Sequence, residues 1–344
     1  MRALQPVYGT TIDTGSELRA EEANDLGGTK MRVTKRFAVA ACVAATFLWA
    51  LPAGAVDWNA VQGRDITLFY PGQASWEWVL TPTDHSGAAL FKEGKNCNEC
   101  HDVDGKSEAP MMGDKIVTGK KLEPSPIAGK PGSIVANVKM THDADSFYAR
   151  FEFQNPPTVG EQMAPDEVKV TMMLSDGKVE EAKRAGCWAA CHDDLATMPS
   201  APEGRAITKY LMRSRVKMTR QGGPDVKPAD DLKAMRGDGQ VLEYWQAALN
   251  DGKPAKASEG YVLGSREFKR SKVVTAESQF ENGKWVVVLS RKLVAGAPYT
   301  DLVAGHSYMV GFAIHGGYAA RRYHWVSFEK TMMLDNGESN FVAK

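Results

Sequence analysis

Short segments in which apolar and polar residues alternate, separated by turn residues, fill much of the chain after residue 55. A period of two places the apolar side chains of a β-strand on one face, so such segments are candidate strands. Eight segments carry a strand-like pattern: residues 66–70, 76–80, 134–140, 147–153, 277–281, 284–292, 307–314 and 324–334. Many short strands with turn signals between them predict a mainly β fold, an antiparallel β-sandwich.

Two turns are expected to join neighbouring strands into hairpins. Residues 143–145 (Asp-Ala-Asp) connect the third and fourth of these segments, and Asn282-Gly283 connects the fifth and sixth. Asn-Gly favours the type I′ turn, whose twist matches that of paired strands. We therefore expect both pairs of segments to be antiparallel.

Helices are expected to be few and short. Residues 86–95 have a helical pattern, and residues 240–250 carry apolar residues at helical spacing. Gly252 is well placed to end the second of these helices. The predicted fold is therefore a sandwich with only a small helical part.

Residues 31–55 have the organisation of a secretory signal peptide. A basic start is followed by an apolar stretch over residues 37–51 and by Ala-Gly-Ala at 53–55, so cleavage is expected after Ala55. A retained membrane anchor is the alternative, but the apolar stretch is shorter than the roughly 20 residues of a membrane-spanning helix. We predict an exported, periplasmic protein with no membrane span after cleavage.

Residues 1–30 are polar and contain no recognisable targeting element. Because Met31 begins a complete signal peptide, translation is expected to start there, and residues 1–30 would then be an upstream extension. The mature protein would comprise residues 56–344 as one domain. Its formal net charge is close to zero, as it is for the whole chain, and without a basic excess no nucleic-acid partner is expected.

Four of the five cysteines follow the signal peptide, in two close pairs that are each followed at once by histidine. The first pair, in residues 97–101 (CNECH), has the spacing of a c-type haem attachment site. In such a site the thiols of Cys97 and Cys100 bond to the porphyrin, and His101 becomes the proximal ligand of the iron.

The second pair lies in residues 187–192 (CWAACH), with one extra residue between the cysteines. By the same reasoning Cys187 and Cys191 attach a second haem and His192 is its proximal ligand. Two disulfides, or a zinc ion bound by the cysteines, are the alternatives. Disulfides would leave both adjacent histidines unexplained, so the sequence predicts two haem c groups.

Two stretches rich in Gly, Pro, Lys and Ser follow the motifs, at residues 102–133 and 193–206. They are expected to be irregular and to wrap the porphyrins. The haem motifs would then lie in loops between strands, unlike the small helical domain that is usual for a single haem c.

Four parts of the sequence resemble the cytochrome c-552 family. They are residues 65–75 (DITLFYPGQAS), 138–143 (VKMTHD) with 151–153 (FEF), 186–192 (GCWAACH) and 322–328 (RYHWVSF). The resemblance extends from about residue 60 to 340. The family shares its haem-binding domain with the γ subunits of ethylbenzene and dimethyl sulfide dehydrogenases, which implies a β-sandwich haem domain that relays electrons in the bacterial periplasm.

The resemblance also implies a link to denitrification and redox partner proteins: a quinol-oxidising membrane cytochrome, and a terminal reductase or dehydrogenase. One departure limits what is carried over. The dehydrogenase γ subunits bind one b-type haem through methionine and lysine, without cysteines, whereas this chain has two cysteine motifs. The methionine and lysine ligands of the γ subunits are therefore not assigned to residues of this chain.

An iron that only transfers electrons is expected to have a sixth ligand, usually His or Met. The candidate distal histidines are His85, His142, His315 and His324. His306, which opens a strand beside glycine, is expected to be structural. The candidate methionines are Met111, Met112, Met172, Met173, Met198, Met332 and Met333. Core packing is the commoner role for any one of these methionines.

Three functions are compatible with two haem motifs. The leading prediction is an electron carrier without enzyme activity. A dihaem peroxidase would require one five-coordinate iron and an acid–base residue above its open face, and no local motif marks such a pair. A haem subunit of a molybdenum-type dehydrogenase is the third function, and it rests on the γ-subunit relationship.

Overall fold

The computed structural model describes residues 56–103, 105–119, 122–123, 128–157, 165–166, 168–186, 188, 208, 210–316 and 324–344. The chain divides into two compact units, Met1–Leu51 and Pro52–Lys344, and all described residues belong to the second. The predicted extension and signal peptide lie outside the described residues.

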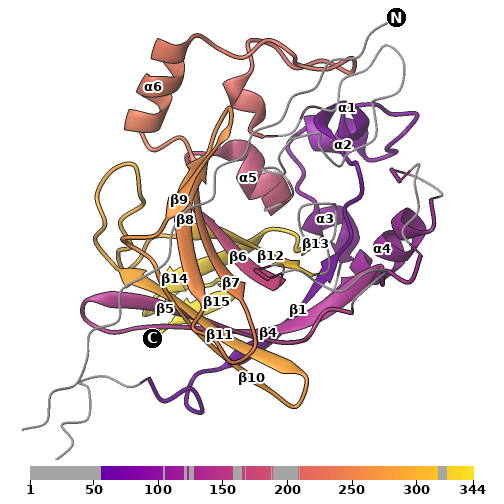
Figure 1. Cartoon of the computed structure of the whole chain (residues 1–344). Helices are drawn as coiled ribbons and strands as arrows, with labels where there is room; N and C mark the ends of the chain where they lie inside the picture. The colour runs from indigo at the N-terminus through magenta and orange to yellow at the C-terminus, as the bar shows by residue number, and fades with distance from the viewer. Residues whose placement is uncertain are drawn as a thin grey trace, which may run out of the picture. The chain divides into compact units, whose positions relative to one another are not determined.

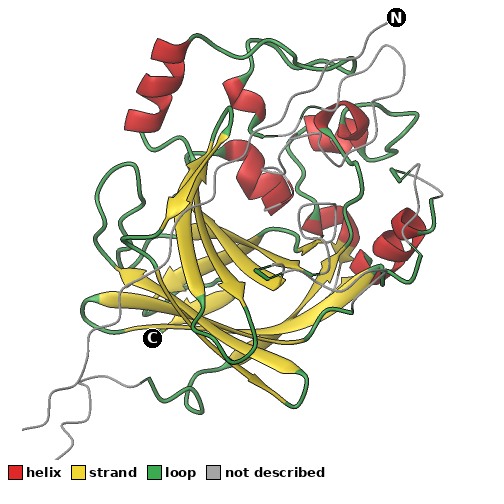
Figure 2. Ribbon diagram, in the orientation of Figure 1, coloured by secondary structure: helices red, strands yellow, loops and turns green. Residues whose placement is uncertain are grey.

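One sheet of 13 strands makes up most of the second unit, and all but one of its strand pairs are antiparallel (Figures 1 and 2). Its order is β10-β11-β5-β4-β1-β13-β12-β6-β7-β8-β9, and β14 pairs with β12 and with β15. The strands are β1 (Gly63–Phe69), β4 (Ser133–His142), β5 (Ser146–Gln154), β6 (Val168–Ser175), β7 (Leu242–Leu249), β8 (Lys256–Val262), β9 (Arg266–Arg270), β10 (Thr275–Glu281), β11 (Lys284–Lys292), β12 (Tyr308–His315), β13 (His324–Val326), β14 (Lys330–Leu334) and β15 (Phe341–Ala343).

The sheet curls over so that its two halves face each other. Strand β10 contacts β7 and β8, and β11 contacts β7. Between the halves, the ring centroids of Phe147 and Trp245 are 6.0 Å apart, and those of Phe151 and Phe312 are 5.5 Å apart. This packing confirms the predicted mainly β, antiparallel, sandwich-like fold.

The helices are short, and α1 to α5 lie on one side of the sheet (Figure 1). They are α1 (Trp76–Val79), α2 (Ala88–Lys92), α3 (Asn98–His101), α4 (Ala109–Val117), α5 (Glu180–Ala185) and α6 (Ala229–Gly237). A small hairpin of β2 (Asp102–Val103) and β3 (Lys106–Ser107) follows α3. A second hydrophobic cluster, which includes Trp76, Phe91 and Phe328, packs these helices against the sheet.

Both predicted hairpins are confirmed. Strands β4 and β5 pair directly through the turn at residues 143–145, and β10 pairs with β11. The turn residues Asn282 and Gly283 have φ angles of 52° and 77°, as a type I′ turn requires. The helix expected within residues 86–95 is present as the shorter α2.

The strand predicted at residues 76–80 is wrong, because this segment forms helix α1. The Ser75 side chain accepts a hydrogen bond from the Trp78 amide and caps the helix. Trp76 is almost fully buried, and its indole donates to the carbonyl of Tyr210. Capping and this tertiary contact outweigh the strand tendency of the apolar residues.

The helix predicted at residues 240–250 is also wrong, because the segment forms the inner strand β7. Every residue of β7 is buried, and β7 lies between β6 and β8. A strand that is covered on both faces carries apolar residues at nearly every position. Such a run also satisfies the spacing of a helix, so periodicity alone could not distinguish a buried strand from a helix.

The long strand predicted at residues 324–334 is interrupted. It forms β13 and β14, with residues 327–329 between them. The Ser327 hydroxyl accepts a hydrogen bond from the Phe312 amide at 2.9 Å, and the Ser327 amide donates to the Phe312 carbonyl. The interruption brings Phe328 and Glu329 to the site described below.

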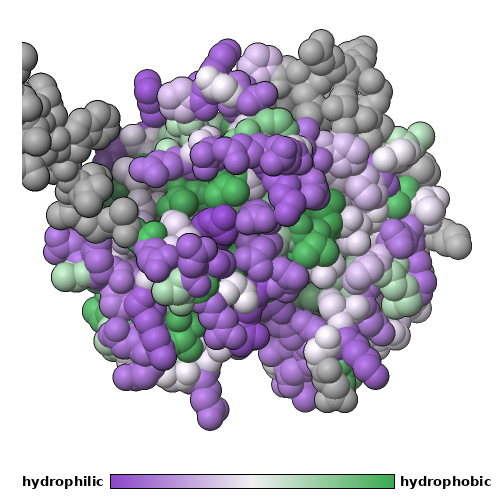
Figure 3. All heavy atoms as spheres, turned by 90° about the horizontal axis from the view of Figure 1, so that it is seen from below, coloured by the Kyte–Doolittle hydropathy of each residue, from purple (hydrophilic) through white to green (hydrophobic). Residues whose placement is uncertain are grey.

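Hydrophilic side chains cover most of the face seen in Figure 3, where hydrophobic residues gather in separate clusters. This agrees with outer strands such as β5 and β11, in which buried positions alternate with more accessible ones. Within the described ranges, none of the helices has the length and apolar character needed to cross a membrane.

Candidate haem-binding site

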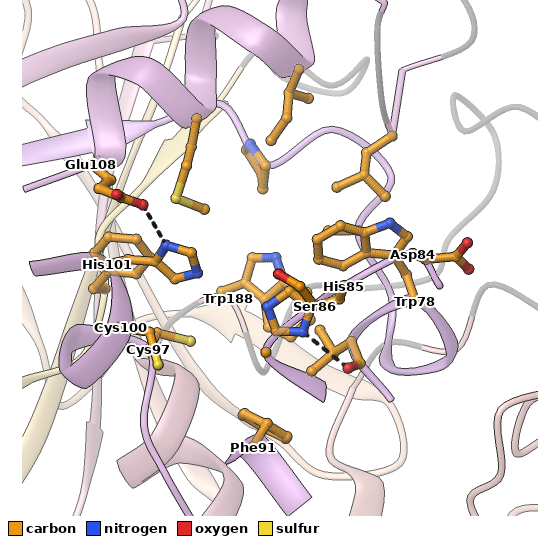
Figure 4. Close-up of a pocket in the computed structure, with 18 of the residues that line it drawn as sticks. Trp78, Asp84, His85, Ser86, Phe91, Cys97, Cys100, His101, Glu108 and Trp188 are labelled. Carbon is orange, nitrogen blue, oxygen red and sulfur yellow. Dashed lines mark hydrogen bonds and ion pairs between the residues drawn. The ribbon is translucent and has the colours of Figure 1, made fainter. Parts of the chain in front are cut away.

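The first cysteine motif forms one turn of helix beside a cavity. Cys97 immediately precedes α3, and the amides of Cys100 and His101 donate to the Cys97 carbonyl. Residues three and four apart lie on the same side of a helix. Both sulfur atoms and the His101 ring therefore face the same cavity, as Figure 4 shows.

This cavity has a volume of about 390 Å³ and mostly apolar walls. Such a volume falls within the range of roughly 300–1,000 Å³ that is usual for cofactor and small-molecule sites. Its apolar lining comprises, among others, Phe69, Trp78, Val79, Phe91, Met111, Met112, Ile116, Trp188 and Phe328. Strand β1, helices α1, α2 and α4, and the segment between β13 and β14 thus converge on one pocket.

His101 is held in a defined orientation. Its Nδ1 lies 2.9 Å from Oε2 of Glu108, and its ring is nearly parallel to that of Phe328, with centroids 5.9 Å apart. When Nδ1 donates to a carboxylate, Nε2 of a neutral imidazole carries the lone pair that a metal requires. The contact with Glu108 therefore leaves Nε2 of His101 able to bind a metal ion.

His85 lies across the cavity from His101 (Figure 4). Its Nδ1 is 3.1 Å from the carbonyl oxygen of Val79, which only accepts, so Nδ1 must be the donor. The two ring centroids are 6.2 Å apart, with 30° between the ring planes. Two imidazoles bound at about 2 Å to opposite sides of one metal ion have centroids about 6 Å apart.

These groups fit a haem c. Two thiols lie at one end of the cavity, two imidazoles are spaced to hold one iron between them, and apolar side chains surround them. Each imidazole has its Nδ1 directed to an oxygen acceptor. Of the four histidines predicted as distal candidates, the structure brings only His85 to this cavity.

His142 lies elsewhere, against the C-terminal part of the chain. Its Nδ1 is 2.9 Å from the carbonyl oxygen of Asp143, and its Nε2 is 3.0 Å from Asp335. His315 and His324 face each other on β12 and β13, with ring centroids 5.4 Å apart. None of these three histidines lines the cavity next to Cys97.

The methionine candidates separate in the same way. Met111 and Met112, on α4, line the cavity, whereas Met172 and Met332 are fully buried in the main core. Met173 belongs to the second hydrophobic cluster. His306 lies on the surface with its Nε2 2.9 Å from the Asp176 carbonyl, a structural contact. Met198 lies outside the described residues.

The segment that leads into the second motif contacts the first motif directly. The amide of Cys97 donates to the carbonyl of Arg184 at 2.8 Å. Gly186 follows with φ of 61°, and a Cβ there would come within 2.6 Å of the Glu329 amide nitrogen. Cys187, Cys191 and His192 themselves lie outside the described residues.

Glu329 connects the first motif to the strands. Its Oε1 accepts a hydrogen bond from the Asn98 amide at 2.9 Å, and its backbone carbonyl accepts one from the Asn98 side chain. The side chain is buried, with Oε2 lacking a hydrogen-bond partner among the described residues. Burial raises the pKa of Glu329 to about 8, so this carboxyl is held as a neutral acid beside the site.

Glu329→Gln is expected to stabilise the protein increasingly as pH rises from about 4.5 to about 8. In the unfolded chain the carboxyl ionises near its ordinary value of 4.5, whereas the folded chain holds its proton up to about pH 8. The wild type therefore loses stability across this window, and the uncharged glutamine does not. The difference would reach roughly 3–5 kcal/mol. Urea unfolding at pH 5 and pH 8.5 measures it, and an equal effect at both pH values would contradict it.

The sequence did not identify Glu108, Phe328 and Glu329 as residues of this site. It also did not place Trp188 in the cavity. Glu108 follows His101 by seven residues in an irregular stretch, and Glu329 lies 231 residues from Asn98. No single helix or strand connects either pair, because the β2–β3 hairpin lies between His101 and Glu108 and most of the sheet lies between Asn98 and Glu329. The sequence offered one signal for Glu329, a short break between two strand-like patterns. That break was interpreted as part of a single strand over residues 324–334.

Comparisons with known proteins identify relatives of this chain. The family described as ethylbenzene dehydrogenase matches residues 260–327. Cytochrome c-552 of Stutzerimonas stutzeri is 36% identical over 302 residues, which cover 87% of this chain and 94% of that protein. Cytochrome c-551 of Rhodocyclus tenuis is 30% identical over 279 residues, covering 79% and 92%.

Among solved structures, a family 9 carbohydrate binding module from Caldicellulosiruptor kristjanssonii in complex with glucose is similar to part of the chain. The match covers 56% of this chain and 65% of that one, at 10% identity and a TM-score of 0.27. A structural similarity this low supports no conclusion about the fold or a ligand of this chain.

Proposed function

The chain belongs to the family of the cytochromes c-552 and c-551, which shares the ethylbenzene dehydrogenase domain, and we propose that it is a periplasmic carrier with two haem c groups. Membership makes it an electron-transfer cytochrome with haem c. The proposal adds the number of haems, the compartment and the respiratory role.

The arrangement of His85 and His101 is the observation that carries this function. Their rings lie 6.2 Å apart in an apolar cavity next to Cys97 and Cys100. A bound haem supplies a one-electron iron couple. With an imidazole on each side, the iron would be six-coordinate, as electron transfer without substrate binding requires.

The protein residues around the cavity each have a defined part in this proposal. Cys97 and Cys100 would attach the porphyrin, and His101 and His85 would bind its iron. Glu108 and the Val79 carbonyl hold the two rings at 2.9 and 3.1 Å. The apolar walls limit water, and together with two imidazole ligands they tune the potential, which a methionine ligand would raise.

The second haem is assigned to Cys187, Cys191 and His192. Two observations support this assignment. The pattern of two cysteines followed by histidine is repeated, and Arg184, just before the second motif, accepts a hydrogen bond from Cys97 of the first motif. His315 and His324, paired on neighbouring strands, remain candidates for its distal ligand. His142, whose ring nitrogens are directed at Asp143 and Asp335, is the weaker candidate.

The proposed compartment and partners are supported by the signal-peptide pattern and by the family resemblance. Residues 31–55 resemble a signal peptide, which supports a periplasmic location. The proposed donors and acceptors are a quinol-oxidising membrane cytochrome and a terminal reductase or dehydrogenase, with denitrification as the expected setting. No nucleic-acid partner is proposed.

A haem subunit of a molybdenum-type dehydrogenase is the second candidate, because residues 260–327 match the ethylbenzene dehydrogenase family. Co-purification with a large catalytic chain would favour it. A dihaem peroxidase would have to use the second iron, because His85 would occupy the face of the first iron that a peroxide needs.

Spectroscopy of the purified holoprotein separates a carrier from a peroxidase. The carrier predicts low-spin signals from both irons in electron paramagnetic resonance and no rapid turnover of hydrogen peroxide. A high-spin iron together with rapid peroxide consumption would overturn the proposal. The oxidised and reduced states should both be stable, because no substrate takes part.

A further inference from the structure

The indole of Trp78 packs against the imidazole of His85. Their ring centroids are 5.0 Å apart, and the ring planes are inclined by 31°. This separation is within the range over which aromatic rings attract one another. In Figure 4, Trp78 lies on the far side of His85 from His101. The His85 ring therefore has an aromatic neighbour on the side away from the other imidazole.

Helix α1 holds Trp78 in this position. Residues two apart on a helix point in nearly opposite directions, so Trp76 is buried in the second hydrophobic cluster while Trp78 lines the haem cavity. The Trp76 indole donates to the Tyr210 carbonyl at 2.8 Å, and Ser75 caps the helix. Trp78 itself is only partly buried, so core packing alone does not account for a tryptophan there. Its contact with His85 gives this large ring a specific role.

Two further contacts restrict the His85 ring. Its Nδ1 is 3.1 Å from the Val79 carbonyl oxygen. A Cβ at Gly87 would lie only 3.1 Å from both Cε1 and Nε2 of His85, so glycine leaves the room that the ring needs. The hydrogen bond positions one edge of the ring, and the flat indole of Trp78 limits how far the ring plane can turn.

Phe328 supports His101 in the corresponding way. The two ring centroids are 5.9 Å apart, and the ring planes are within 11° of parallel. Phe328 is buried and packs against Phe69, with ring centroids 4.9 Å apart. Each imidazole of the cavity thus lies beside an aromatic ring, and the two imidazole planes are inclined to each other by 30°.

We propose that Trp78 is a positioning residue that fixes the plane of the His85 imidazole. Together with Phe328 beside His101, it sets the angle between the two imidazole planes. This inference rests on the proposed binding of one iron by both histidines. A ring that keeps its orientation in both oxidation states lowers the reorganisation that accompanies electron transfer.

The angle between the imidazole planes has a spectroscopic consequence. In low-spin iron(III) with two imidazole ligands, nearly parallel planes give three well-separated g values, whereas perpendicular planes give one very large g value. The angle of 30° predicts the first kind of spectrum for the first haem. The g values therefore report the ring orientation that Trp78 is proposed to hold.

The test compares Trp78→Leu, Trp78→Phe and Phe91→Leu in the full-length holoprotein. Leucine keeps an apolar side chain but removes the flat ring, which phenylalanine retains. Phe91 is the matched control, because its ring also lines the cavity but, among the described residues, contacts Trp76 and Arg184 and neither imidazole. Intact mass first confirms the wild-type haem content in each variant. Electron paramagnetic resonance of the oxidised proteins then gives the g values of the first haem, identified as the low-spin signal that His85→Ala removes.

We expect three resolved g values in the wild type. Trp78→Leu should shift and broaden this signal or turn part of it high-spin, Trp78→Phe should restore it, and Phe91→Leu should leave it unchanged. A single very large g value in the wild type, wild-type g values in Trp78→Leu, or an equal change in Phe91→Leu would each overturn the inference while iron binding by His85 stands. If His85→Ala removes no low-spin signal, the proposed ligation of the first haem fails, and the inference fails with it.

Discussion

His85→Ala is expected to convert the first haem from a six-coordinate low-spin iron to a five-coordinate high-spin iron. His85 is the histidine that faces His101 across the cavity, with ring centroids 6.2 Å apart. Alanine offers no donor, and neither do the neighbouring Trp78 and Val79 side chains. Met111 and Met112 also line the cavity, and if either bound the iron in the variant, the spectrum would stay low-spin and the midpoint potential would rise instead. The reduced variant should then bind carbon monoxide at one haem per chain, which the wild type should not do. Absorption and electron paramagnetic resonance spectra measure both changes.

His142→Ala is the matched control for this prediction. His142 was an equal candidate in the sequence, but its ring nitrogens are directed at the Asp143 carbonyl and at Asp335, outside the cavity. Its removal should leave the haem spectra unchanged. Unchanged spectra in His85→Ala, or a high-spin signal in His142→Ala instead, would show that the first distal ligand has been assigned to the wrong residue.

The double variant Cys97→Ser/Cys100→Ser should lose one of two covalently bound haems. Both sulfur atoms face the cavity from a single helical turn (Figure 4), and serine cannot form the thioether bonds. Intact mass should fall by one haem, and acid–acetone extraction should leave one haem on the chain. The strands should keep their structure, because the main core is formed by residues outside this motif.

Cys187→Ser/Cys191→Ser provides the reciprocal variant. It should also lose one haem and retain the other, while the fourfold variant should carry none. If the first pair of substitutions leaves the covalent haem content unchanged, Cys97 and Cys100 are not an attachment site. If the second pair of substitutions leaves the covalent haem content unchanged, the motif with the longer cysteine spacing is not an attachment site.

The sequence was most informative where one face of a strand is exposed. Strands β4 and β5 alternate buried with more accessible residues, and their pattern predicted both strands and their turn. The pattern failed for β7, where both faces are buried. It also failed at residues 76–80, where a serine cap and a contact of Trp76 with a distant carbonyl decide the local structure.

The part of the site whose residues lie close together in the sequence was predictable. Cys97, Cys100 and His101 lie within five residues, and the structure places all three at one cavity. The opposite wall depends on contacts between remote segments, such as Asn98 with Glu329. No periodicity encodes these contacts, so four histidines remained candidates until the fold separated His85 from the others.

The number of covalent haems per chain is the measurement that tests the proposed function most directly. It combines a pyridine haemochrome assay with intact mass on protein purified from the periplasm. Two haems per chain, on a polypeptide that begins after Ala55, are predicted. One haem, or a chain whose cysteines are joined by disulfides, would contradict the assignment of residues 187–192 as a second attachment site and with it the two-haem carrier.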